Sequence, residues 1–221
     1  MPPPPERPDL VAGSTSTAPG EGHRRRAAVM AGHLGDPLTA SSARTDPSPG
    51  VRAAALGALD RLGILHPADL GDALDDPSPL VRRRACELCA TRAQIGTHRL
   101  PGLLGDDDAT VVEAACFALG ELGSPAGAEA TAALAVVVTA HEDPLCREAA
   151  VAALGAVEDP AGLPAILAAT TDKPAVRRRA VLALAPFDGP EVDAALARAA
   201  SDRDWQVRQA AEDLGVLPDG G

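Results

Sequence analysis

The chain has 221 residues, a formal net charge of −11 and only three aromatic side chains, none of them a tyrosine. The negative charge makes nucleic acids and anionic membranes unlikely partners, because long-range repulsion opposes their approach. The shortage of aromatic residues argues against base-stacking platforms and aromatic ligand pockets. No run of about 18 apolar residues is present, so we expect no membrane span.

The N-terminal region, residues 1–22, is rich in Pro, Gly, Ser and Thr. Such a segment buries too little apolar surface to order itself, so we predict a disordered tail. It lacks the basic start and apolar stretch of a secretory signal, which favours a cytoplasmic protein. Residues 23–50 are ambiguous. His23–Leu34 could form a degenerate second helix and residues 37–44 a degenerate first helix, together a cap repeat.

An internal repeat begins in this region and continues to residue 217. The phrase Asp46-Pro-Ser-Pro-Gly-Val51-Arg52 returns as Asp76-Pro-Ser-Pro-Leu-Val81-Arg82. Weaker copies follow at Val111-Val112, Cys146-Arg147, Val176-Arg177 and Val207-Arg208, at intervals of 30, 30, 35, 30 and 31 residues. A period of this length indicates a solenoid, in which each unit buries its apolar face against its neighbours.

Each copy reads as a helix with one apolar face. Four residues after the Val position, every copy has an alanine: Ala55, Ala85, Ala115, Ala150, Ala180 and Ala211. Most copies also have an apolar residue eight positions on, so offsets 0, 4 and 8 share one helical face. We predict second helices at 51–62, 80–93, 110–122, 144–157, 175–185 and 205–214.

Glycines and prolines mark the boundaries of these helices. Gly63, Gly96, Gly123, Gly189 and Gly215 follow most of the second helices, where a residue with positive φ can end a helix. Prolines then open the next helix, where a missing N–H is harmless. We predict first helices at 66–75, 97–104, 124–140, 159–170 and 189–200, and the longer helix at 126–140 explains the 35-residue interval. The last four residues, 218–221, are expected to be flexible.

The Asp-x-x-x-x-Val-Arg pattern, followed by an alanine-rich helix that closes on Leu-Gly, resembles the short HEAT-like repeats also found in the bilin lyase family. The resemblance covers residues 36–217 and implies an all-α, right-handed α-solenoid of about five HEAT-like repeats. It also implies an Asp–Arg ladder between successive repeats. The ladder acids would be Asp46, Asp76, Asp106, Asp172 and Asp202, and the bases Arg52, Arg82, Arg147, Arg177 and Arg208. Val112 stands in an arginine place and should break the ladder, and in the fourth unit the acid is shifted toward Asp143.

The sequence offers little for catalysis or metal binding. Cys86, Cys89, Cys116 and Cys146 all occupy apolar repeat positions, so we predict buried thiols without disulfides, as in a reducing cytoplasm. The five histidines show no repeat spacing, and no nucleophile, base and acid are arranged for catalysis. We therefore predict no enzyme activity, no metal site and no cofactor.

Charge is segregated along the second helices. Beyond the ladder arginines, two units carry the pairs Arg83-Arg84 and Arg178-Arg179, whereas the two units between them carry Glu113 and Glu148. In the resembling family the second helices line the concave surface. These six residues are the candidates for partner binding, and their order of basic, acidic, acidic and basic could select a partner of matching charge.

These observations favour a monomeric, non-enzymatic scaffold or adaptor that binds an unidentified protein through its concave face. The arginine-rich, lysine-poor composition suggests a GC-rich bacterial source, since Lys173 is the only lysine. Two alternatives remain open: a bilin-lyase-like or other tetrapyrrole-handling protein, suggested by the resemblance, and a regulatory subunit of a separate enzyme.

Overall fold

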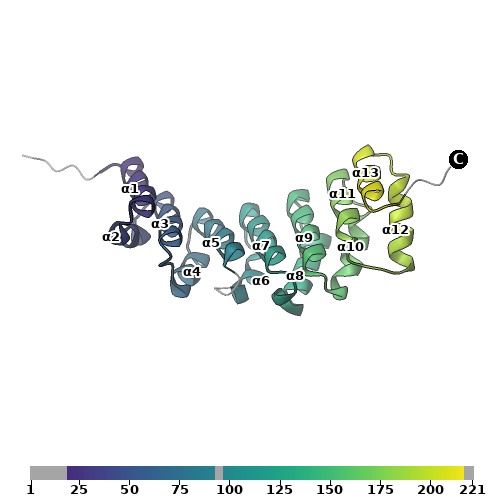
Figure 1. Ribbon diagram of the computed structural model, residues 1–221, viewed down its shortest axis with the longest axis horizontal. Helices are drawn as coiled ribbons and strands as arrows, with labels where there is room; N and C mark the ends of the chain where they lie inside the picture. Colours follow the sequence, from purple (N-terminus) through teal and green to yellow (C-terminus); the bar gives the residue numbers. More distant parts are fainter. Residues whose placement is uncertain (1–18, 93–96, 217–221) are drawn as a thin grey trace, which may run out of the picture.

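The computed structural model describes residues 19–92 and 97–216, and these form helices and turns with no strand. The helices make two layers along one elongated, curved body (Figure 1). The layer on the concave side contains α1 (Glu21–Leu34), α3 (Pro49–Arg61), α5 (Pro79–Thr91), α7 (Ala109–Leu122), α9 (Pro144–Val157), α11 (Pro174–Ala183) and α13 (Trp205–Asp213). These helices pack side by side in chain order. The predicted all-α solenoid is confirmed, whereas its handedness stays a prediction.

The outer layer contains α2 (Pro37–Ser42), α4 (Pro67–Leu74), α6 (Leu100–Leu103), α8 (Gly127–Ala140), α10 (Leu163–Ala169) and α12 (Pro190–Ala200). Short 3-10 turns join the layers at η1 (Ala43–Thr45), η2 (Thr97–Arg99), η3 (Ser124–Ala126) and η4 (Pro160–Gly162). With 14 residues, α8 is longer than α4, α6 and α10, which have 8, 4 and 7. The longer α8 accounts for the 35-residue interval, as predicted.

The repeated alanine is the centre of each buried helix face. All six copies, from Ala55 to Ala211, are 0% exposed. In α3 the flanking Val51 and Leu59 are also buried, at 1% and 2% exposure. The main core extends along the body from α1 to α12, because each unit presents this face to its neighbours rather than to a common centre, and a smaller second core lies at the C-terminal end around Val207.

The glycine stops adopt the backbone that was predicted for them. Gly63, Gly123, Gly189 and Gly215 all have positive φ, while Gly96 lies outside the described residues. At the end of α9 the left-handed position is filled by Glu158, with φ 59°, the only non-glycine of this kind in the described chain. Of the tail predicted at residues 1–22, residues 1–18 lie outside the described part, as does the predicted flexible end at 218–221. The first helix, α1, begins at Glu21, two residues before the expected boundary.

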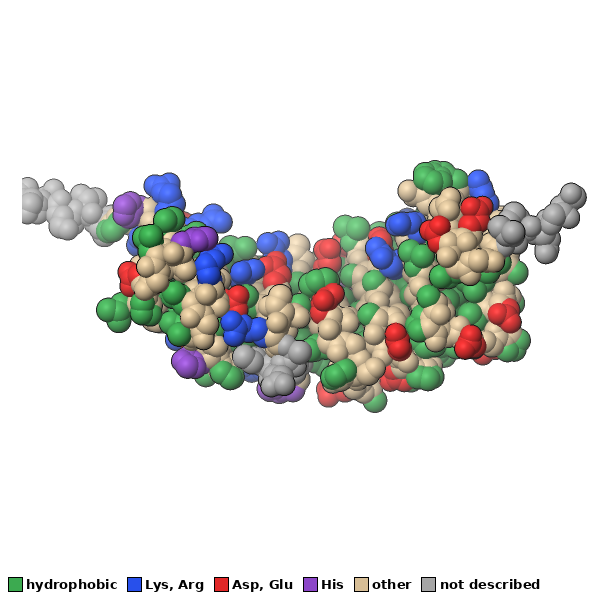
Figure 2. All heavy atoms as spheres, viewed as in Figure 1, with side chains coloured by type: hydrophobic (Ala, Val, Ile, Leu, Met, Phe, Trp, Pro, Cys, Tyr) green, Lys and Arg blue, Asp and Glu red, His purple; other side chains and the backbone are tan. Residues whose placement is uncertain are grey.

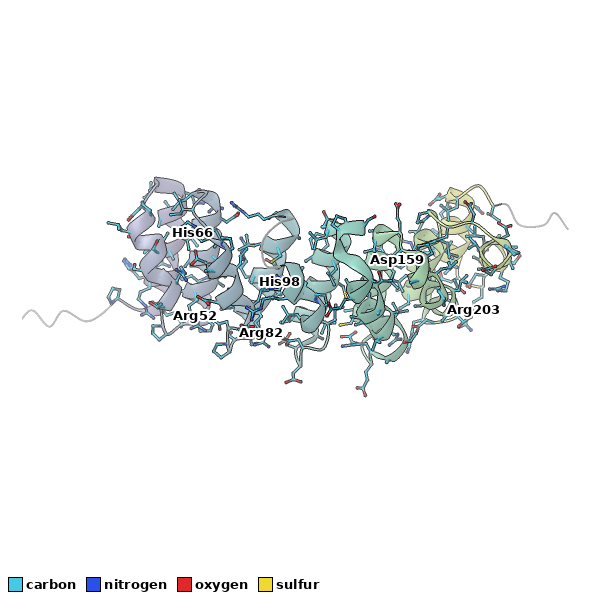
Figure 3. The ribbon with its side chains drawn as sticks, turned by 90° about the horizontal axis from the view of Figure 1, so that it is seen from below. Arg52, His66, Arg82, His98, Asp159 and Arg203 are labelled. Carbon is cyan, nitrogen blue, oxygen red and sulfur yellow. The ribbon has the colours of Figure 1, made fainter. Side chains whose placement is uncertain are left out.

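The Asp–Arg ladder joins successive inner helices along one long edge of the body, where Figure 3 shows Arg52 and Arg82. The guanidinium of Arg52 donates from Nε and Nη2 to both carboxylate oxygens of Asp76, at 2.8 and 2.7 Å. Its Nη1 donates to the carbonyl oxygen of Asp46, at 2.9 Å. Each such arginine therefore links its own turn to the next turn through a bidentate, charge-assisted pair.

The same two-oxygen pairing recurs in three more of the predicted steps: Arg82 with Asp106, Arg147 with Asp172, and Arg177 with Asp202. The structure adds a step that the sequence reasoning missed, because Arg24 of α1 pairs with Asp46 at 2.7 Å. Thus α1 occupies the place of a second helix. At the other end, Arg208 donates to the Asp202 carbonyl oxygen at 2.7 Å but pairs with no carboxylate among the described residues.

The ladder is interrupted between α7 and α9, as the Val112 substitution predicted. The structure also corrects the idea of a shifted acid in the fourth unit. Asp143 caps α9 by accepting from the Leu145 N–H at 2.9 Å, and His141 occupies the ladder position instead. Its Nδ1 accepts from the Asp143 N–H at 3.1 Å, the role that a ladder aspartate plays in other turns. At this step Val112 replaces the ladder arginine and His141 replaces the ladder aspartate, so neither position carries a buried charge without its partner.

Hydrogen bonding lowers the pKa of all five ladder aspartates, namely Asp46, Asp76, Asp106, Asp172 and Asp202. For four of them the arginine side chain is the main cause. At Asp76, burial acts to raise the pKa, but the bonds from Arg52 and from the Ser78 N–H outweigh it. These carboxylates are thus held in the charged form.

Candidate functional site

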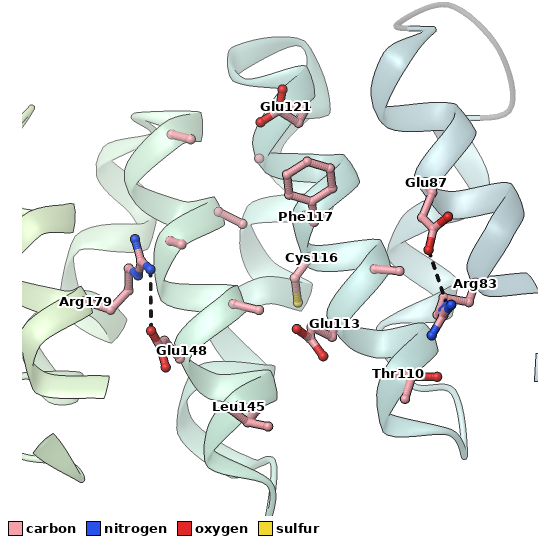
Figure 4. A pocket seen from close by; sticks show the side chains of 16 residues that line it. Arg83, Glu87, Thr110, Glu113, Cys116, Phe117, Glu121, Leu145, Glu148 and Arg179 are labelled. Carbon is pink, nitrogen blue, oxygen red and sulfur yellow. Dashed lines mark hydrogen bonds and ion pairs between the residues drawn. The ribbon is translucent and has the colours of Figure 1, made fainter. Parts of the chain in front are cut away.

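A groove of about 850 Å³ lies on the concave side, across α5, α7, α9 and α11. It lies at the middle of the body, where Figure 2 shows acidic side chains along the upper edge between basic clusters on either side. We call it the central groove. Figure 4 shows its walls and the side chains that line it.

The base of the central groove consists of small residues from α7 and α9: Ala114, Gly120, Ala149, Ala152, Ala153 and Ala156. They are small because neighbouring inner helices come close on the concave side. A Cβ added at Gly120 would lie 3.2 Å from the Cα of Ala153, and one at Gly155 would lie 2.8 Å from the Cβ of Ala183. Small side chains thus permit both the close helix contacts and the hollow above them.

Two large apolar side chains stand out from this base. Phe117 of α7 is 55% exposed and Leu145 of α9 is 60% exposed, and both line the central groove. Phe117 projects into the open part of the groove in Figure 4. In a chain with only three aromatic residues, an exposed phenylalanine in a hollow is a candidate contact for another molecule.

Four of the six predicted partner-binding residues meet in the central groove. Arg83 of α5, Glu113 of α7, Glu148 of α9 and Arg179 of α11 line it in that order. The predicted sequence of basic, acidic, acidic and basic side chains is therefore present in space across these four helices.

The other two candidates do not line the groove. Arg84 bends toward α3, so that its Nη2 lies 3.0 Å from the position of a Cβ on Gly57, and it pairs with Glu87 at 3.0 Å. Arg178 is exposed elsewhere on α11. The sequence analysis treated the two arginine pairs as equivalent, but α5 contributes the first arginine of its pair, Arg83, and α11 contributes the second of its pair, Arg179.

The two groove arginines are already paired with acids. Arg83 Nε lies 3.3 Å from a carboxylate oxygen of Glu87, and Arg179 Nη2 lies 3.5 Å from one of Glu148 (Figure 4). Glu113 and Glu121 line the groove without an ion pair to any described residue. Two arginines and four glutamates therefore line the groove. The two glutamates without an ion pair, Glu113 and Glu121, both lie on α7 and leave this helix with a net negative charge.

Sequence reasoning missed Phe117, Glu121 and Leu145. A signal for two of them was present, because Glu113, Phe117 and Glu121 recur at intervals of four and therefore share one face of α7. At the Phe117 position the other five copies carry Gly57, Glu87, Ala152, Leu182 and Asp213. This position varies from copy to copy, and only the α7 copy places an aromatic side chain there.

The groove offers little nucleophilic chemistry. Its one thiol, Cys116, is 0% exposed, and burial raises its pKa. Burial also raises the pKa of Cys86 to about 12 and the pKa of Cys89 and Cys146 to about 11. The prediction that all four thiols are buried is confirmed. Among the described residues, no three His, Cys, Asp or Glu side chains converge as metal ligands would.

No single helix of the described chain is long and apolar enough to cross a membrane. The nearest case joins α7 to the segment Ser124–Ala140, and this pair is bent by 115°.

Comparison with known proteins supports the repeat assignment. The profile of HEAT repeats matches three overlapping segments, residues 67–135, 97–185 and 131–214, which together exceed half of the chain. A search of curated protein sequences gave no match.

Among solved structures, an engineered protein superposes with a TM-score of 0.64 at 20% identity, covering 81% of this chain and 96% of its own. A designed armadillo repeat protein, solved in complex with the peptide (KR)4, gives 0.61 at 17% identity, covering 80% and 97%. A second engineered protein gives 0.56 at 18% identity, covering 90% and 99%. At these identities the likeness concerns the fold. With its repeated helix pairs, its Asp–Arg ladder and the matched segments, the chain belongs to the HEAT repeat family.

Proposed function

We propose that this HEAT repeat protein is a non-enzymatic scaffold or adaptor that holds a protein partner in the central groove. The main support is the exposure of Phe117 and Leu145 in a hollow of about 850 Å³ at the middle of the concave face. HEAT repeats commonly serve as binding surfaces, and extended concave surfaces of this kind suit polypeptide partners. We further propose that it acts as a monomer in the cytoplasm.

The charge pattern supports a selective surface. The groove presents arginines at its two ends and unpaired glutamates between them, so a partner of the wrong charge order would meet like charges. Such juxtaposition is unfavourable, which gives specificity and a faster encounter with the right partner more than it gives raw affinity.

The tetrapyrrole alternative gains no support from the thiols. A thiol that captures a tetrapyrrole needs access and a reactive thiolate, whereas all four cysteines are buried with raised pKa values. A regulatory subunit of a separate enzyme would use the same groove, so that alternative differs in the identity of the partner and not in the site.

The test is quantitative capture of partners from native lysate with wild-type protein and the double variant Phe117→Ala, Leu145→Ala. Truncation of anchoring side chains at the centre of an interface typically weakens binding by about 2 kcal/mol or more, which is about thirtyfold in the dissociation constant. The matched control is Val136→Ala, because Val136 is also exposed, at 63%, but lies on α8 of the outer layer. We expect the double variant to lose a partner that the control retains. Equal retention of every partner by all three proteins would refute the proposal.

A further inference from the structure

The acidic side chains of the central groove define the charge of its occupant. Arg83 and Arg179 are each occupied by a glutamate of the groove itself. Glu113 and Glu121 are exposed and pair with no described side chain, so they are free to meet cations. A segment that carries Arg or Lys would complement them, and an acidic segment would be repelled.

The spacing along α7 defines the pattern of that segment. Glu113, Phe117 and Glu121 follow each other at four-residue intervals, with about 1.5 Å of rise per residue. The two carboxylates therefore flank the phenylalanine by about 6 Å of helix axis on either side. A second helix alongside α7 would match this with a basic residue, an apolar residue and a basic residue at the same intervals.

The polar groups of the groove also favour a helix over an extended chain. An extended peptide leaves its N–H and C=O groups unpaired, and these need partners when buried. The groove base is alanine and glycine, no Asn or Gln side chain lines it, and the sequence contains no asparagine at all. A helix brings its main-chain hydrogen bonds with it, so it can lie on an apolar base without loss.

We propose that the occupant of the central groove is an amphipathic helix of a partner protein, with an apolar residue on Phe117 and Leu145 and basic residues facing Glu113 and Glu121. This inference rests on the proposed function and specifies its partner. Because the attraction is partly between exposed charges, binding should weaken as salt is added.

The test starts from an unbiased library of random 16-residue peptides displayed on phage and selected on the folded, full-length protein. We expect the selected peptides to carry net positive charge with basic and apolar residues at intervals of three or four. They should gain helical circular dichroism on binding. A proline placed at the centre of a selected peptide should abolish its binding, since proline breaks a helix.

Variants of the protein then separate the two proposals. The double variant Glu113→Gln, Glu121→Gln should weaken the binding of the selected peptides at least tenfold, mainly through a slower association rate. The matched control, Glu129→Gln with Glu191→Gln, removes the same charge from exposed residues of α8 and α12 and should leave binding unchanged. Acidic or extended peptides that still depend on Phe117 and Leu145 would overturn this inference and leave the scaffold proposal standing. If no selected peptide depends on Phe117 and Leu145, both proposals are overturned.

Discussion

Replacing Gly155 with alanine tests the packing of the inner layer, because the same replacement at Gly57 should have the opposite effect on stability. Both glycines lie inside inner-layer helices, α9 and α3. Alanine is favoured over glycine in a helix interior by about 1 kcal/mol. A Cβ at position 155, however, would lie 2.8 Å from the Cβ and 2.9 Å from the Cα of Ala183. Neither atom can rotate away.

At position 57 the new Cβ would meet only the end of the flexible Arg84 side chain, at 3.0 Å. We therefore expect Gly57→Ala to stabilise the protein by up to about 1 kcal/mol, the helix-propensity gain. At position 155 an overpacking penalty of about 1–3 kcal/mol opposes that gain and should leave a net destabilisation. Gly120→Ala, with its nearest contact at 3.2 Å, should fall between them.

The assay is urea unfolding followed by far-ultraviolet circular dichroism, with thermal melting beside it. Each kcal/mol corresponds to about 2–4 °C for a chain of this size. Since propensity contributes to all three variants, the difference between Gly57→Ala and Gly155→Ala reports the clash alone. Equal effects at these two positions would refute the close contact between α9 and α11 on which the account of the groove depends.

Three further predictions concern the ladder and the thiols. Arg177→Ala leaves the Asp202 carboxylate largely buried without its cation and should lower the free energy of unfolding in urea by about 2–4 kcal/mol. Arg208→Ala breaks only a hydrogen bond to a carbonyl oxygen and should lower it by less than about 1 kcal/mol. A similar decrease for both variants would contradict the ladder. Because folding lowers the pKa of the ladder aspartates, their contribution to stability is complete above the unfolded pKa of about 3.9. That contribution is lost as the pH falls below about 3.9 toward the folded pKa values. A free energy of unfolding that stays level from about pH 6 to pH 2 would be evidence against the ladder. The four thiols should resist a thiol-reactive dye at pH 8 in the native protein and should all react in urea. All four are buried, and burial raises the pKa of Cys86 to about 12. Rapid labelling of any one of them in the native protein would show that this thiol is exposed.

The fold could be predicted from sequence because every unit repeats the same physical solution. The apolar face at offsets 0, 4 and 8, the glycine stop and the turn aspartate recur, so each copy supports the interpretation of the others. The Arg24–Asp46 step was missed because α1 lacks the Val-Arg phrase, so the alignment could not include it. The shifted acid expected at Asp143 was wrong because the Nδ1 of His141 replaces a carboxylate as the hydrogen-bond acceptor of this turn, which the residue type alone does not reveal.

The candidate site was harder to predict, because it depends on positions that differ from copy to copy. The alignment put Arg83, Glu113 and Glu148 at one repeat position, and all three line the groove. It could not show that Arg84 would turn toward α3, or that α11 would contribute Arg179 in place of Arg178, which holds the equivalent position. The groove itself arises from small side chains at helix contacts. Phe117 could be recognised as a candidate contact residue only after the structure placed it, exposed, in that groove.

The central claim is that the groove holds a protein partner, and site-specific cross-linking tests it most directly. A photoreactive phenylalanine analogue would be placed at Phe117 in one variant and at Val136 in another, and both would be irradiated in native lysate. The account predicts a cross-linked polypeptide from Phe117 whose attached segment, identified by mass spectrometry, is a basic amphipathic helix, with no such adduct from Val136. The absence of any adduct at Phe117, or the same adducts from both positions, would contradict it.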